Sequence, residues 1–366
     1  VENCYFHDVP QTAVNLGGNG YGVLTVQCDT VTICGNKFED VARHSIYLSY
    51  DETSLPNRNI FIYDNVFEWT AAVEGNTSGF ETTIQLRPSD FVDIHDNVFI
   101  GLQSGVTLLK QTIPLTQQIR GTKDVKIHNN TFYGLTNTVR PGDGVVLGSS
   151  EGAEATNSAT PEMERVTIEN NTCYDCLVPL LRSSQGRDIY LIGNVMIGTV
   201  GAATYCIHCP DQIDTRHIYS LYVKGNKLVG GSAYCFNIAG TVTSELIIDS
   251  LHIEDNEIDC TGLITFPASG AKVTDFVFKN NRVKATVADS YSNNVKPINV
   301  YASGNSGNVN EKWRADYSES TFYDWDNFLD RIEASLITTA MRRGALIVAS
   351  DNKFYAVSWN GTVTEL

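Results

Sequence analysis

The sequence has no excess of basic residues and no long apolar run, and both absences narrow what the protein can be. Lys and Arg number 26 against 42 Asp and Glu, which gives a formal net charge of −16. A surface with this charge repels a phosphate backbone, so nucleic acid is not expected as a partner. No run of 18 or more apolar residues occurs, so no membrane span is expected.

The start of the chain lacks an initiator Met, and it also lacks a basic stretch followed by an apolar one. No signal peptide is therefore visible. Because the first residues already match the middle of the repeat described below, we expect that an N-terminal part of the natural protein precedes them.

Nine cysteines are an odd number, and they are spread through apolar segments, which does not resemble a disulfide framework. Cys173-x-x-Cys176 and Cys206-x-x-Cys209 have the spacing of a four-thiolate zinc site if the two pairs meet. The alternative is that these cysteines are compact apolar residues inside the fold. Their segments alternate like strands, which favours the second interpretation, and we expect neither metal nor cofactor.

A segment of about ten residues recurs along the chain. Residues 92–101, 125–134 and 166–175 share the core apolar-x-apolar-x-polar-Asn-x-apolar. The asparagines that mark the copies are Asn3, Asn36, Asn65, Asn97, Asn130, Asn171, Asn194, Asn226, Asn256, Asn281 and Asn305, the first and last in weaker copies. Their spacing averages about 30 residues, with gaps from 23 to 41, which is typical of a solenoid with loops of variable length.

Each copy begins as an alternating strand, as in Val125 and Ile127, and bends at the Asn. A second short strand then opens with Phe132 or its equivalent. Asn suits this bend because it tolerates a left-handed backbone and its amide bonds the turn. We expect each amide to bond the equivalent amide of the next coil, in an internal ladder that satisfies buried polar groups.

A third apolar run follows each bend, and helical periodicity is nearly absent from this region. Examples are residues 13–16, 45–48, 83–86, 105–109, 144–147, 205–209 and 298–301. The sequence therefore predicts an all-β fold in which residues 1–309 form a right-handed single-stranded parallel β-helix. It would have about 11 coils, one for each marker Asn, with three short strands per coil.

Composition changes near Asn308. Residues 323–343 carry apolar side chains at spacings of three and four, with acidic residues early and two arginines late, which predicts an amphipathic α-helix. Short apolar runs and the hairpin signal Asn360-Gly361 predict a small antiparallel β-meander over residues 345–366. Residues 310–366 are thus expected to form a segment that caps the open last coil or associates with other subunits.

The apolar-x-apolar-x-x-Asn-x-Phe coil of residues 1–309 resembles the right-handed β-helix family typified by pectate lyases, polygalacturonases and bacteriophage tailspike depolymerases. This resemblance implies an enzyme that cleaves a polysaccharide. Most similar would be the depolymerase part of a phage tailspike, an extracellular homotrimer of the virion tail acting on a bacterial capsule or O-antigen. No stretch matches a catalytic motif of any one of these enzymes, so no site residue follows from the resemblance.

Hydrolysis would need two carboxyl groups, one as general acid and one as base or nucleophile. Long loops flank Asp51, Glu52, Asp143 and Glu151, which makes these four the catalytic candidates. Carboxylates one coil apart would have the spacing of a retaining glycosidase, and two coils apart that of an inverting one. The residues expected to bind substrate are Arg87 and Lys110, for an acidic sugar, and Tyr47, Tyr50 and Trp69, as stacking platforms.

Two alternatives remain open. A lyase would need a base and a cation beside a uronic carboxylate, and Arg87, Lys110, His44 and Tyr47 are the candidates. Calcium would need a cluster of acidic ligands, for which Asp51, Glu52 and Asp90 are the local candidates. A non-catalytic adhesin would use the same surface without a matched acid pair. His95 and His128 occupy equivalent positions in successive copies, which favours strand surface residues over catalytic ones.

Overall fold

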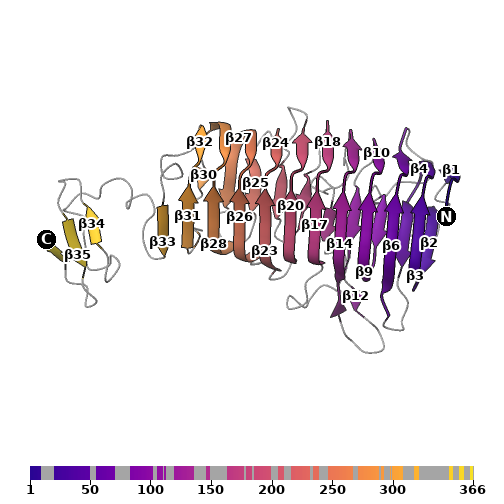
Figure 1. Cartoon of the computed structure of the whole chain (residues 1–366), viewed down its shortest axis with the longest axis horizontal. Helices are drawn as coiled ribbons and strands as arrows, with labels where there is room; N and C mark the ends of the chain where they lie inside the picture. The colour runs from indigo at the N-terminus through magenta and orange to yellow at the C-terminus, as the bar shows by residue number, and fades with distance from the viewer. Residues whose placement is uncertain are drawn as a thin grey trace.

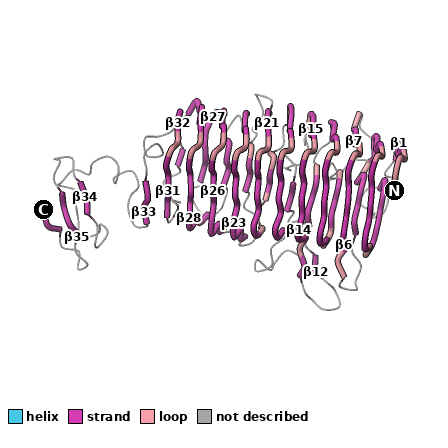
Figure 2. Tube along the Cα trace, in the orientation of Figure 1, coloured by secondary structure: helices cyan, strands magenta, loops and turns pink. Residues whose placement is uncertain are grey.

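The computed structural model describes most of the first 307 residues and short strands beyond them. The described ranges are residues 1–9, 20–49, 55–70, 83–101, 105–109, 111–112, 119–135, 146–148, 163–176, 179–183, 185–198, 205–209, 216–230, 234–238, 246–266, 271–287, 290–291, 297, 299–307, 317–320, 346–348, 354–357 and 363–365. All regular structure in these ranges is strand (Figure 2). None of these residues forms a helix that could cross a membrane.

The ten strands before Asn36 to Asn305, together with β33, form one 11-stranded sheet, here called column 1. They lie side by side along the long axis of the molecule (Figure 1). Column 1 consists of β3(Asp29–Cys34), β6(Asn57–Tyr63), β9(Ser89–His95), β14(Thr122–His128), β17(Met163–Glu169), β20(Arg187–Ile192), β23(Arg216–Lys224), β26(Leu246–Glu254), β28(Ala271–Lys279), β31(Asn299–Ser303) and β33(Tyr317–Ser320). All of its neighbours pair in parallel except β33, which pairs antiparallel with β31 and covers that edge.

The remaining strands of the repeats belong to a 20-stranded parallel sheet with two columns. Column 2 follows the asparagines and consists of β1(Tyr5–Val9), β4(Lys37–Val41), β7(Val66–Glu68), β10(Val98–Ile100), β15(Thr131–Tyr133), β18(Thr172–Tyr174), β21(Val195–Ile197), β24(Lys227–Val229), the first part of β27(Glu257–Phe266), β29(Arg282–Val287) and β32(Ser306–Gly307). Column 3 consists of β2(Tyr21–Val26), β5(His44–Ser49), β8(Ile84–Leu86), β11(Val106–Leu108), β16(Val146–Gly148), β19(Leu181–Arg182), β22(Ile207–Cys209), β25(Tyr234–Ile238), the second part of β27 and β30(Ser290–Tyr291). The predicted all-β fold with long parallel sheets is confirmed, and the arrangement is compatible with a parallel β-helix.

Two short antiparallel pairings complete the described strands. β12(Gln111–Thr112) pairs with β13(Ile119–Arg120). The last three strands, β34(Leu346–Val348), β35(Phe354–Val357) and β36(Val363–Glu365), form an antiparallel sheet, as the β-meander prediction required. The helix predicted for residues 323–343 lies outside the described residues. The run at residues 298–301 was expected as a third strand, but it instead belongs to β31 in column 1. It lies directly before Asn305, and the strand before a ladder Asn is always a column 1 strand.

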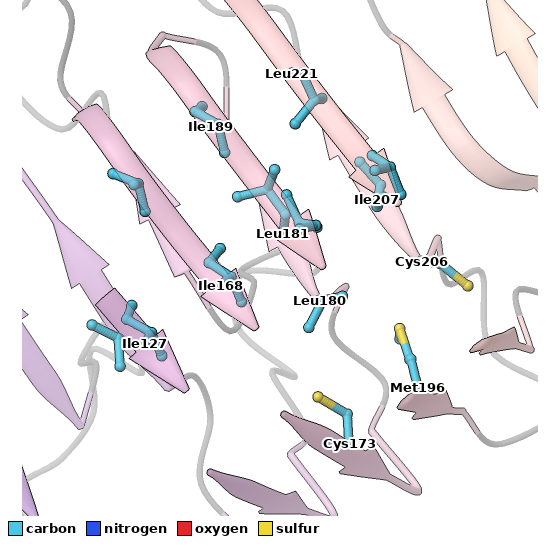
Figure 3. Packing of buried hydrophobic residues seen from close by; sticks show 14 of the residues in the cluster. Ile127, Ile168, Cys173, Leu180, Leu181, Ile189, Met196, Cys206, Ile207 and Leu221 are labelled. Carbon is cyan, nitrogen blue, oxygen red and sulfur yellow. The ribbon is translucent and has the colours of Figure 1, made fainter. Parts of the chain in front are cut away.

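The core forms because alternate residues of every strand point inward and lie in register with the same residue type in the next repeat. Ile94 pairs with Ile127, and Ile127 with Ile168, and all three are fully buried. In column 2, five phenylalanines stack with ring centroids 4.5 to 5.0 Å apart: Phe6, Phe38, Phe67, Phe99 and Phe132. Cys173 takes the next position of this stack, followed by Met196, and Figure 3 shows both packed in the interior.

The asparagine ladder is confirmed from Asn36 to Asn305. At every step the side-chain nitrogen donates to the side-chain oxygen of the next Asn, at 2.9 to 3.1 Å. The backbone N–H of each Asn donates to the same oxygen. All ten are buried, so the ladder satisfies polar groups that would otherwise lose water without compensation.

The left-handed residue of each bend is the one before the ladder Asn, which corrects the expectation that the ladder Asn itself takes this conformation. Positive φ values between 52° and 66° occur at Asn3, Gly35, Asp64, Asp96, Asn129, Asn170, Gly193, Gly225, Asp255, Asn280 and Gly304. Every one is Asn, Asp or Gly, the residue types that tolerate this backbone at least cost. Asn3 is therefore a bend residue, and Cys4, whose backbone N–H donates to Asn36, stands at the ladder position.

Candidate functional site

Three of the nine predicted site residues lie in the part of the chain that the structure describes. Tyr47 and Arg87 belong to column 3, and Trp69 follows the column 2 strand β7. The other six lie outside the described residues: Tyr50, Asp51, Glu52, Lys110, Asp143 and Glu151. The structure therefore brings together part of the predicted binding surface, whereas the predicted acid pair stays a prediction.

Tyr47 and Arg87 meet on the outer side of column 3. Strand alternation buries Ile46 and Leu48 and leaves Tyr47 between them partly exposed. Arg87 directly follows β8, the next strand of the column, and its Nε donates to the Tyr47 hydroxyl oxygen at 3.2 Å. The two residues are 40 positions apart in the sequence, and the parallel register of β5 and β8 places them side by side.

Aromatic rings hold Tyr47 on the side of the preceding strand. The ring of Tyr21 stacks on Tyr47 with centroids 5.2 Å apart, and His44 lies 5.2 Å from the same ring. His44 is only 1% exposed, and the Arg43 guanidinium lies 5.1 Å from the centre of the Tyr21 ring. Tyr47 is thus fixed by packing on one side and by a cation on the other. We call Tyr21, Arg43, His44, Tyr47 and Arg87 the Tyr47 cluster.

Trp69 belongs to a different part of the surface from Tyr47. It lies just after β7 in column 2, where its backbone N–H donates to the carbonyl of Ile100 at 3.0 Å. Its side chain is partly buried and packs against the core. Packing under a turn is the simpler role for this ring, as expected for an aromatic residue in such a place.

Asp90, considered above as a calcium ligand, is occupied by an ion pair. It is 7% exposed, and one of its oxygens lies 2.8 Å from Arg120 Nη2 and 4.0 Å from Arg58 Nε. A carboxylate held by two arginines is a poor calcium ligand, because the cations compete for the same charge. Within the described ranges, no group of three or more His, Cys, Asp or Glu is arranged to hold a metal ion.

The nine cysteines all lie in described residues, and all are free thiols. Cys173 and Cys176 share a hydrogen bond, which together with burial raises the pKa of the Cys173 thiol. Cys206 instead bonds Cys235 of the next repeat, and burial alone raises the pKa of Cys209 to about 12. The two Cys-x-x-Cys pairs therefore serve as apolar interior residues, and the structure does not support the zinc alternative.

His95 and His128 are neighbours on the outer side of column 1, as their equivalent positions predict. Their rings stack with centroids 5.0 Å apart, and Tyr63 stacks on His95 at the same distance. His95 contacts Asp96 at 2.7 Å and His128 contacts Asp93 at 2.9 Å. Because the ring faces cover each other, this ladder offers edges rather than faces to a ligand.

A second polar group on column 3 was not singled out from the sequence. Arg182 on β19 and His208 on β22 are register partners, and the Tyr205 ring lies 5.0 Å from that of His208. Burial, together with the neighbouring Arg182, lowers the pKa of His208 to about 3. The sequence pattern that predicts an outward His208 is the alternation of residues 205–209, in which apolar Ile207 points inward and His208 outward.

Column 3 therefore carries two polar groups on one face, the Tyr47 cluster and the Arg182–His208 pair. Outward positions on four other strands of the column are also polar, at Gln85, Thr107, Asn237 and Thr265, whereas the same position is Leu24 on β2 and Leu147 on β16. Comparison of the chain with models of known protein families, with curated proteins and with solved structures found no match in any of the three.

Proposed function

We propose that this chain is a right-handed parallel β-helix that binds and cleaves an acidic polysaccharide along column 3. Support for the β-helix comes from the three columns of strands in register and from the continuous asparagine ladder. Such a stack presents side chains from successive repeats as a strip, along which a polymer can lie. Polar and aromatic residues on that strip suit the hydroxyl groups and apolar faces of sugars.

The observation that carries the proposal is the contact between Arg87 and Tyr47, with His44 beside it. These three residues are those that a uronate lyase would need. An arginine can neutralise the sugar carboxylate, which makes the neighbouring carbon more acidic. Tyr47, acting in its deprotonated form as the general base, would take that proton. The electron pair would form a carbon–carbon double bond, the bond to the glycosidic oxygen would break, and that oxygen would take a proton from water.

Hydrolysis by the predicted acid pair is the second candidate. Asp51 and Glu52 follow β5, whereas Asp143 and Glu151 flank β16. These strands are three steps apart in column 3, which is about 14 Å along the stack. The four carboxyl groups themselves lie outside the described residues, so the acid pair stays a prediction. Elimination is placed first because the residues of the Tyr47 cluster lie in the described part of the chain.

The wider setting is also a proposal. The repeat resembles that of tailspike depolymerases, so we propose a phage tailspike, extracellular on the virion, that acts on a bacterial capsule or O-antigen as a homotrimer. A non-catalytic adhesin or receptor-binding protein would use the same strip for binding alone. Light scattering measures the mass of the particle and tests the trimer directly.

Incubation with a panel of acidic and neutral polysaccharides tests the function. Shorter products with the ultraviolet absorbance of an unsaturated uronate support elimination. Shorter products without this absorbance support hydrolysis, and retention of the polymer without cleavage supports the adhesin. If no polysaccharide of the panel is cleaved or retained, the proposal is wrong.

A further inference from the structure

Arg182 and His208 form a group that the Tyr47 cluster does not use. They stand at the same register position on neighbouring strands of column 3, whose backbones are about 4.8 Å apart. The residue before each of them is fully buried, Leu181 in β19 and Ile207 in β22. Strand alternation therefore directs both Arg182 and His208 to the outer side, on the face that carries Tyr47.

His208 is unusual for a surface histidine. Its Nδ1 atom is buried and has no hydrogen-bond partner in the part of the chain that the structure describes. Burial and the adjacent Arg182 lower its pKa to about 3, so the ring is neutral at neutral pH. A buried polar atom without a hydrogen-bond partner costs folding free energy. An oxyanion bound between the two residues would supply that partner and face the Arg182 guanidinium.

A second such atom lies on the same column. The Thr107 side-chain oxygen on β11 is buried and, among the described residues, has no hydrogen-bond partner. Thr107 shares its register position with Gln85 on one side and, two strands further on, with Arg182. Most buried polar groups in proteins are satisfied, so two exceptions at one register position of column 3 are consistent with a polar ligand as the missing partner.

From this geometry we propose that Arg182 and His208 form a subsite for the anionic group, carboxylate or sulfate, of a sugar residue. It lies about four strand steps, or about 19 Å, from Tyr47 along column 3. The guanidinium donates two parallel hydrogen bonds to an oxyanion, and the imidazole adds a third donor. Asn237 and Thr265, on the next two strands, continue the polar row. The inference rests on the proposed function and adds to it the charge of the substrate at a second position.

The test follows the imidazole of His208 by NMR at pH 6 while a ligand is added, with the resonance assigned from the His208→Gln variant. The probes are a tetramer of galacturonate, inorganic sulfate and, as the neutral control, maltotetraose. We expect the galacturonate tetramer to shift the His208 signals toward the protonated form, because a bound anion raises the pKa of the ring. A response to sulfate alone would assign the subsite to a sulfated sugar.

Arg182→Gln should weaken binding of the responding anion at least about tenfold. Arg182→Lys keeps the charge but loses the paired hydrogen bonds of the guanidinium, so its affinity should lie between those of the wild type and Arg182→Gln. Circular dichroism of each variant controls for the fold. The inference is overturned if neither anion shifts the His208 signals, or if Arg182→Gln binds the anion as tightly as the wild type. If His208 does not respond but the protein still cleaves polysaccharide, only the subsite is refuted. If His208 responds but the protein neither cleaves nor retains any polymer, only the proposed function is refuted.

Discussion

The side chain of Asn130 donates from Nδ2 to Oδ1 of Asn171 at 3.0 Å, although 41 residues separate them. The next step, from Asn171 to Asn194, spans 23 residues and has the same length. Loop length therefore has no influence on the geometry of the ladder. The strands on either side of these insertions still pair in register, as expected for a fold in which each repeat contacts only its neighbours.

Replacement of one ladder residue should destabilise the fold. Asn130→Ala removes the amide that bonds Asn171, Ile94 and His128, and it leaves the backbone N–H of Asn97 without its acceptor. Because these groups are buried, the free energy of unfolding should fall by about 1–3 kcal/mol or more. Urea denaturation measures it. The matched control is Asn129→Gly, since Gly also tolerates the left-handed backbone, and a loss as large in the control would contradict the ladder as the cause.

Replacement of Phe91 should instead stabilise the protein. Phe91 has a φ of 58°, and its side chain is 58% exposed. A bulky residue in this conformation is strained by roughly 1–2 kcal/mol. Phe91→Asn should therefore raise the free energy of unfolding by about 1 kcal/mol, whereas Phe61→Asn, on the neighbouring strand and 39% exposed with ordinary φ, should bring no gain. A fall in stability for Phe91→Asn would mean that packing of the ring outweighs the strain.

The pH dependence of stability should contain a contribution from His208. Its folded pKa of about 3 lies below the ordinary value of 6.5, so between these values the unfolded chain binds the extra proton. The contribution is thus fully present above pH 6.5 and is lost as the pH falls toward 3. His208→Gln should flatten unfolding free energies measured from pH 4 to pH 7. Arg182→Gln should flatten them in part, because Arg182 is one cause of the low pKa, and unchanged slopes in both variants would exclude this explanation.

Cleavage should depend on the Tyr47 cluster. Tyr47→Phe removes the hydroxyl that Arg87 contacts, and Arg87→Gln removes the cation. Each should lower the rate of formation of unsaturated product about 10²-fold or more, the usual contribution of a positioned base. Tyr21→Phe keeps the ring that stacks on Tyr47 and serves as the control. If Tyr47→Phe cleaves at the wild-type rate, Tyr47 is not the base and the reaction takes place at other residues.

The acid candidates separate elimination from hydrolysis. If the protein is a lyase of the proposed kind, Asp51→Asn, Glu52→Gln, Asp143→Asn and Glu151→Gln should all retain cleavage, because no carboxyl side chain of the protein takes part in the reaction. Product analysis by mass spectrometry distinguishes the two outcomes. Loss of cleavage in one of these variants, with products that carry an added water, would restore hydrolysis by the acid pair.

Much of the fold was predictable because its information is local and repeated. The spacing of the asparagines and the alternation beside Val125 and Ile127 predict the strands, the ladder and the inward faces. Two details were misplaced. The left-handed residue is the one before each ladder Asn, and the strand at Asn299–Ser303 belongs to column 1. The second error arises because strand alternation looks the same in every column, so that pattern alone does not identify the column. The first arises because Asn, Asp and Gly all tolerate the left-handed backbone, so residue type alone does not choose between adjacent positions of the bend.

The sequence by itself determined the all-β class, the period of about 30 residues and the outward direction of Tyr47, since side-chain direction in a strand follows from parity. Only the tertiary structure decided which outward residues meet. Arg87 lies beside Tyr47, and His208 beside Arg182, through a register set by hydrogen bonds between strands. Loops of unequal length separate those strands, so the number of residues between two positions does not tell whether their side chains are in contact.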